Sequence, residues 1–85
     1  MGFSEVIDKY RTISGNGKPA SFRQFAEQIN VDLPRDHYYR PEHWYAVARG
    51  TYRPNFYPLF YLSQFATGWV RDFAADMLTA LEGRA

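Results

Sequence analysis

Hydrophobic side chains recur along this chain at steps of three and four residues, the spacing that places them on one face of an α-helix. The repeat is clearest from Trp69 onward and stops at Gly83. Shorter repeats predict further helices over residues 3–13, 21–30, 41–49 and 55–66. No segment shows the sustained alternation of a half-buried strand. The pattern therefore predicts an all-α, compact bundle of five helices.

Each predicted helix has an apolar side that we expect to face a common core. In chain order these sides comprise Phe3, Val6, Ile7, Tyr10 and Ile13; Phe22, Phe25, Ala26 and Ile29; Trp44, Val47 and Ala48; Phe56, Leu59, Phe60, Leu62 and Phe65; and Trp69, Val70, Phe73, Ala74, Met77, Leu78 and Leu81. Between the second and third helices, residues 31–40 contain Pro34 and no helical stripe, which predicts a loop. Val31 and Leu33 are expected to anchor that loop to the core.

Residues with strong positional preferences mark the helix ends. Ser21 is placed to cap the second helix, and Pro41 suits a first turn, where its missing N–H is not needed. Gly50 suits the left-handed position that ends a helix. Asn55 is expected to cap the fourth helix.

Composition narrows the class of protein. With 85 residues, one domain spanning 1–85 is expected, and a 19% share of aromatic residues helps so short a chain to build a core. The chain has no cysteine, which excludes disulfides and thiolate metal sites and fits a cytoplasmic location. No apolar run approaches the ~20 residues that cross a bilayer. The N-terminus also lacks the pattern of a secretory signal.

The net charge is only +1, so any binding of a polyanion must depend on how the charges are distributed. Basic residues gather around the third predicted helix and at the start of the second, with tyrosines between them. The group comprises Lys18, Arg23, Arg35, Arg40, Arg49 and Arg53, with Tyr38, Tyr39, Tyr45 and Tyr52. The acids Asp72, Asp76 and Glu82 lie in the last helix. We therefore expect one basic face.

Residues 21–66 resemble the helix-turn-helix of the Cro/repressor family, which is lambda-repressor-like and Xre-like. Ser21 stands at the capping position, Ala26 at the small residue where the two helices cross, and Asn30 at the end of the first helix. Gly50 and Pro54 match the glycine-to-proline spacing that follows the recognition helix. The segment 31–40 is longer than the 3–4-residue turn of the motif.

The resemblance implies a transcriptional regulator that binds double-stranded DNA, with the third helix in the major groove. The residues expected to face the bases are Arg40, His43, Tyr45 and Arg49. The residues expected to hold phosphates are Lys18, Arg23, Arg35 and Arg53. The resemblance also implies a homodimer, for which Met77, Leu78 and Leu81 of the last helix are candidates, unless the first helix covers them.

A second interpretation keeps the bundle and replaces DNA with a protein partner, because Tyr, Trp and Arg also dominate protein interfaces. The long turn favours it, as does Phe22, which stands where the family often has a phosphate-binding Gln. No spacing matches a nucleophile motif, a phosphate loop or a metal site, and His37 and His43 are expected to be ordinary surface histidines. We therefore expect neither an enzyme nor a cofactor.

Overall fold

The computed structural model describes residues 2–83, and its regular structure in that range is entirely helical. The elements are α1 (Phe3–Ser14), α2 (Phe22–Asn30), a 3₁₀ turn η1 (Arg35–His37), α3 (Pro41–Arg49), α4 (Phe56–Phe65) and α5 (Gly68–Glu82). The predicted all-α class is confirmed, with helix ends within one or two residues of the expected ones. Within the described range, none of the helices combines the length and the apolar character needed to span a bilayer.

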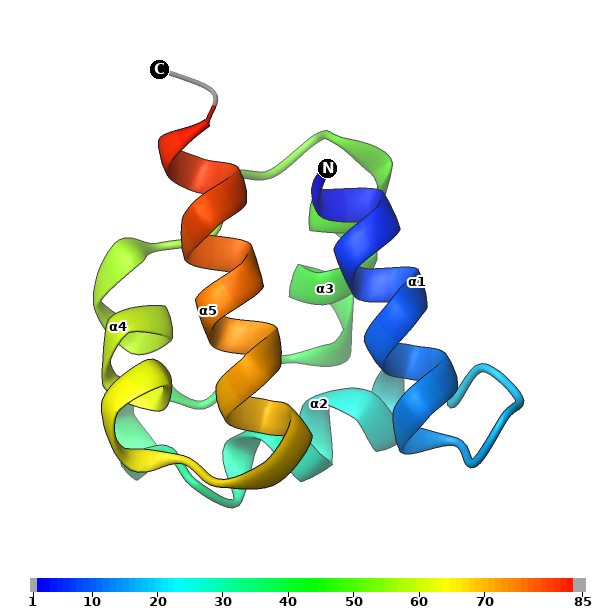
Figure 1. Ribbon diagram of the computed structural model, residues 1–85, viewed down its shortest axis with the longest axis horizontal. Coiled ribbons are helices and arrows are strands. Elements are labelled where there is room, and N and C mark those ends of the chain that lie inside the picture. The colour runs from blue at the N-terminus through cyan, green and yellow to red at the C-terminus, as the bar shows by residue number, and fades with distance from the viewer. Residues whose placement is uncertain (1, 84–85) are drawn as a thin grey trace.

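The helices are arranged around α5, which lies at the centre of the view in Figure 1 with α4 on one side and α1 on the other. α3 lies behind α1, and α2 crosses below and packs on both α1 and α3. The centre of the core is aromatic: Phe25, Trp44 and Phe73 are fully buried, with ring centroids 5.1–6.0 Å apart and edge-on contacts. Edge-to-face packing adds to the free energy gained by burying these rings. Three helices, α2, α3 and α5, are thus joined by one contact cluster.

The apolar stripe of α5 belongs to the core. Val70, Phe73, Met77 and Leu81 are at most 9% exposed, because α1 and α4 pack against α5. Leu78 is partly buried against the same core. Of the two alternatives for Met77, Leu78 and Leu81, the one in which helices of the same chain cover them is therefore observed: Met77 and Leu81 are buried, and neither is available to a second copy.

Outside α4, two expected core residues, Ile13 and Val31, lie on the surface. Ile13 is 45% exposed, because the last turn of α1 extends past the core. Val31 is 78% exposed and does not anchor the loop after α2, whereas Leu33 is buried as expected. Of the two expected anchors of this loop, Leu33 is therefore the one that packs on the core.

The expected helix ends are confirmed at three of the four marked positions. Ser21 Oγ accepts a hydrogen bond from the backbone N–H of Gln24 at 3.1 Å, and Pro41 occupies the first position of α3. Gly50 has a φ of 80°, and hydrogen bonds from the backbone N–H of Gly50 to Val47 O and of Thr51 to Ala46 O complete the Schellman end of α3. Asn55 precedes α4 but makes no capping hydrogen bond through its side chain.

Candidate nucleic-acid interface

Asn30 closes the long segment between α2 and α3. Its side-chain Nδ2 donates to Tyr39 O, and the backbone N–H of Tyr39 donates to Asn30 Oδ1, both at 2.8 Å. This pair of bonds joins residues nine positions apart, so residues 31–38 form a closed excursion of the kind seen in Ω-loops. The length of the segment therefore does not separate α3 from α2, and the two helices pack as direct neighbours.

The outward side of α3 carries Glu42, Tyr45 and Arg49, while Trp44 and Val47 face the core. Positions 42, 45 and 49 follow the helical period, so their side chains share one face. His43 lies at the edge of this face, where its Nδ1 accepts a hydrogen bond from the backbone N–H of Arg40 at 3.3 Å. That bond leaves Nε2 as the ring nitrogen able to donate to a ligand when the imidazole is neutral.

An aromatic row flanks α3 on the side of His43. The imidazole stacks on Tyr52 with ring centroids 5.4 Å apart, and Tyr39 meets His43 edge-on at 6.3 Å. Tyr52 is 40% exposed, but Tyr39 is only 8% exposed, so Tyr39 belongs to the core rather than to the expected surface group. Burial, with a smaller contribution from Tyr52, raises the pKa of Tyr39 well above its usual range.

Rings and guanidinium groups alternate on the other flank of α3. Tyr45 packs edge-on against Phe22 at 5.4 Å, and the Arg49 guanidinium lies 5.5 Å from the centre of the Tyr45 ring. Arg11 covers the Phe22 ring at 4.0 Å. These cation–π distances are in the attractive range. Phe22 therefore packs against Tyr45 and holds its ring in place. In the helix-turn-helix family that the sequence resembles, this position often carries a polar residue that binds phosphate.

The described cations divide into two groups. Lys9, Arg11, Arg23 and Arg71 each lie within 4.0 Å of a carboxylate oxygen. The cations that make no such ion pair within residues 2–83 are Lys18, Arg35, Arg40, Arg49 and Arg53. Four of these five lie in the segment 35–53, which contains only two acids, Asp36 and Glu42. The guanidinium groups around α3 are thus free to bind an external anion.

Arg49 and Arg53 line the same surface recess of about 420 Å³, together with Phe3 and Ser4 at the start of α1. The chain reverses between them at Gly50, which brings the residues after α3 back toward the helix. Arg49 and Arg53 therefore border one concave surface.

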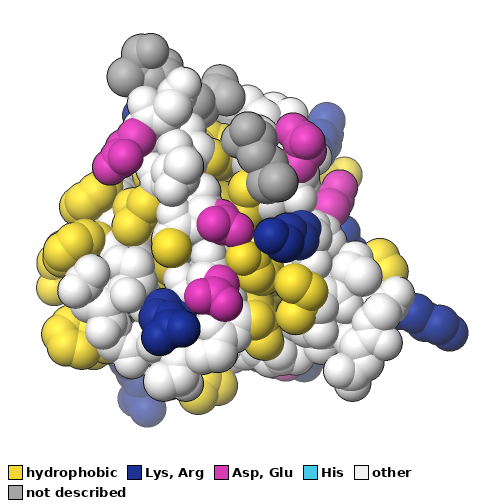
Figure 2. Space-filling model, viewed as in Figure 1, with side chains coloured by type: hydrophobic (Ala, Val, Ile, Leu, Met, Phe, Trp, Pro, Cys, Tyr) yellow, Lys and Arg dark blue, Asp and Glu magenta, His cyan; other side chains and the backbone are white. Residues whose placement is uncertain are grey.

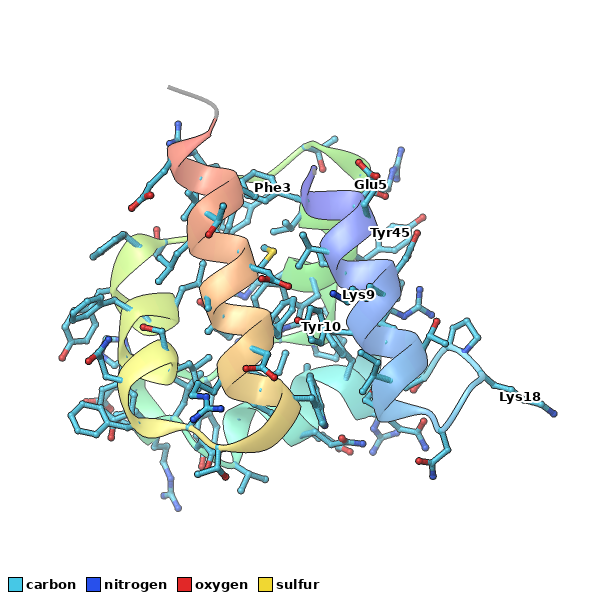
Figure 3. All side chains as sticks on the ribbon, viewed as in Figure 1. Phe3, Glu5, Lys9, Tyr10, Lys18 and Tyr45 are labelled. Carbon is cyan, nitrogen blue, oxygen red and sulfur yellow. The ribbon has the colours of Figure 1, made fainter. Side chains whose placement is uncertain are left out.

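The structure separates the remaining predicted site residues. Arg40 and His43 lie together at the start of α3. Arg23 is on the exposed side of α2 in an ion pair with Glu27 at 3.5 Å. Lys18 projects from the tip of the loop after α1 (Figure 3), and Arg35 lies in η1. In the part of the chain described here, the Lys18 and Arg35 side chains make no hydrogen bond, ion pair or cation–π contact with α3.

Sequence reasoning missed a second surface, the outer side of α4. Phe56, Phe60 and Phe65 were expected in the core but are 44–68% exposed, because α4 packs mainly on α5 and its opposite side is uncovered. The sequence does contain a sign of this surface. No residue between Arg53 and Arg71 is charged, so α4 lacks the charged residues that the outer side of a surface helix normally carries.

The fold and these surfaces define a small all-α protein with an arginine- and tyrosine-rich face around α3 and an aromatic face on α4. Comparison with known protein families, curated proteins and solved structures finds no match. Within residues 2–83, no three His, Asp or Glu side chains are grouped so as to hold a metal ion.

Proposed function

We propose that this protein binds double-stranded DNA through the face formed by α3 and the residues that follow it, as a transcriptional regulator. The observation that carries the proposal is the division of the cations, since the guanidinium groups of Arg40, Arg49 and Arg53 have no ion-pair partner among the described residues. Unpaired Arg side chains beside exposed tyrosines are the usual contacts to DNA phosphates.

The roles of the residues follow from their places on this face. Arg49 and Arg53 border one recess, so we assign them to phosphates or to a phosphate and a guanine edge. Arg40 and the Nε2 of His43 are placed to donate at the other end of α3. Tyr45 is 50% exposed and supported by Phe22, so it is held outward as a contact residue. Glu42 on the same face repels phosphate unless it accepts a hydrogen bond from cytosine.

The test is DNA binding by the full chain at several salt concentrations, using mixed duplexes. Replacing both Arg49 and Arg53 by Ala is expected to weaken binding and to reduce the slope of log affinity against log salt by about 2. The matched control is Arg71→Ala, an exposed arginine of α5 that is paired with Asp72 at 3.7 Å. Equal affinity of the double variant and the wild-type protein for every duplex would exclude this face.

A protein partner is the second candidate function. Tyr38, Tyr45 and Tyr52 are 40–50% exposed, and such rings are frequent in the centres of protein interfaces. Salt dependence separates the two functions, because release of counterions from DNA gives a steep slope that a tyrosine-centred protein contact does not share. A complex that forms equally well at low and moderate salt and requires Tyr45 but not Arg49 supports the protein partner.

A further inference from the structure

The outer side of α4 is an aromatic ridge, which we define as Phe56, Tyr57, Phe60, Tyr61, Gln64 and Phe65. Its members form two rows at four-residue spacing, 56–60–64 and 57–61–65. Phe56 and Phe60 stack with centroids 5.5 Å apart, and Tyr61 meets Phe65 at 4.7 Å. Figure 2 shows hydrophobic side chains gathered along the edge of the molecule over α4.

The area of this ridge is large for a small protein. Phe56, Tyr57, Phe60 and Phe65 are 57%, 57%, 44% and 68% exposed. At roughly 200 Å² for each aromatic side chain, these four rings expose about 450 Å². A patch of that size lies in the middle of the range for the largest apolar patch of a monomer, about 300–600 Å², and such patches are often binding surfaces. A standard interface takes about 800 Å² from each partner, so the four rings supply roughly half of that area, and Tyr61, Gln64 and the polar rim would supply the rest.

The absence of charge on the ridge indicates what kind of partner can pack against it. A charged partner would need complementary charges, but residues 54–70 contain none. Two identical ridges can meet without repulsion for the same reason. Rows at four-residue spacing on two copies of one helix also interdigitate with each other, at a crossing angle of about −50°. We propose that α4 forms the interface of a homodimer, in which the aromatic ridges of two copies pack against each other.

The proposed homodimer is independent of the proposed DNA binding. In Figure 1, α4 lies on the side of α5 opposite to α1. Figure 3 shows Tyr45 projecting beyond α1, on the side away from α4. Pairing through α4 therefore leaves Tyr45 uncovered, whereas Arg53 lies beside the ridge, because it lines one recess with Phe56. The dimer is tested on the protein alone, so its failure and the failure of DNA binding are separate results.

The first experiment measures the mass of the full chain by sedimentation equilibrium over a wide range of concentration. The wild-type mass is expected to rise from 9.9 kDa toward twice that value. Phe60→Glu places two carboxylates near the two-fold axis and is expected to weaken association by at least about 100-fold. The matched control is Ile13→Glu on α1, because Ile13 is 45% exposed and Phe60 is 44% exposed. Circular dichroism verifies that both variants remain helical.

A second experiment avoids any loss of apolar side chains. The chain has no cysteine, so Gln64→Cys introduces a single thiol on the ridge. A short bifunctional thiol reagent is expected to give a covalent dimer from this variant and none from the control Ile13→Cys. A wild-type protein that stays monomeric up to about millimolar concentration overturns the proposal. So does association that persists in Phe60→Glu, or cross-linking that is equal at positions 64 and 13.

Discussion

The surfaces around α3 and α4 are both rich in exposed aromatic rings, but they differ in what surrounds those rings. Around α3, Tyr45 is flanked by Arg49 and Tyr52 is stacked on His43. On α4 the rings contact one another and have no charged neighbour within the helix. Aromatic content alone therefore does not identify a binding surface. The charges beside the rings make the first surface suitable for a polyanion and the second for an apolar partner.

Salt is expected to separate the two surfaces most strongly. If Arg40, Arg49 and Arg53 each contact a phosphate, raising the salt from about 50 to 200 mM lowers DNA affinity roughly 40-fold, because counterion release then contributes less to binding. Association through the uncharged α4 ridge is expected to change by less than about 2-fold over the same range, since no ion pair is screened. Titrations of labelled duplex and sedimentation of protein alone give the two values. Equal salt dependence of DNA binding and of self-association would contradict this difference between the α3 and α4 surfaces.

The next largest effect concerns Asn30, whose hydrogen bonds to Tyr39 hold the chain that leads into α3. Asn30→Ala removes both hydrogen bonds to Tyr39 and leaves two backbone groups beside the core without their partner. The expected loss is about 2 kcal/mol in the free energy of unfolding, measured by urea titration. Gln28→Ala is the control, because Gln28 is exposed on the same helix. If the two variants are equally stable, the Asn30–Tyr39 pair does not hold the loop closed.

The Asn30–Tyr39 hydrogen bonds also show what could and could not be predicted from the sequence. Local chemistry fixes the helix ends, and Ser21 and Gly50 were therefore predictable from their own side-chain and backbone preferences. A hydrogen bond between residues nine positions apart depends on the packing of α2 against α3, so neither the closed loop nor the burial of Tyr39 could be inferred.

The exposed side of α4 was missed for a related reason. The spacing of apolar residues along the sequence identifies side chains suited to burial. It does not show how many other helices pack on that helix to bury them. α4 has one main neighbour, so Leu59 is buried while Phe60 beside it is 44% exposed. Arg40, Arg49 and Arg53 were expected near α3 from their position in the chain, and they lie at or next to it. That they make no ion pair within residues 2–83 depends on the tertiary structure.

Two buried tyrosines, Tyr10 on α1 and Tyr39 just before α3, are expected to make the stability of the fold depend on alkaline pH. Burial raises the pKa of Tyr39, and burial with the hydrogen bond to Asp76 raises that of Tyr10. Below about pH 10 both phenols are protonated in the folded and unfolded states, so neither makes stability depend on pH. Above about pH 10 the phenols ionise in the unfolded chain while they stay protonated in the folded protein. Each group is therefore expected to lower the free energy of unfolding by about 1.4 kcal/mol per pH unit.

Tyr39→Phe is expected to remove about half of that alkaline slope. The Tyr39 hydroxyl is buried and has no hydrogen-bond partner among the described residues, so its loss should leave the stability at pH 7 equal or slightly higher. Tyr10→Phe is the comparison, because it removes a similar share of the slope but also the 2.6 Å hydrogen bond to Asp76. Urea titrations at pH 7, 10 and 11 measure both quantities. An unchanged slope in Tyr39→Phe would show that this phenol titrates freely in the folded protein.

The smallest expected effect is at Glu42, the acid on the outward side of α3. Near a phosphate, one carboxylate in a solvent-exposed setting costs a few tenths of a kcal/mol to about 1 kcal/mol, so Glu42→Gln is expected to strengthen binding to mixed duplexes about 3-fold. Asp72→Asn on α5 makes the same change in net charge away from α3, and we expect a smaller gain from it. Equal gains would mean that only the total charge matters. Weaker binding by Glu42→Gln on selected duplexes would instead identify this carboxylate as a hydrogen-bond acceptor for cytosine, since that contact can outweigh its repulsion of phosphate.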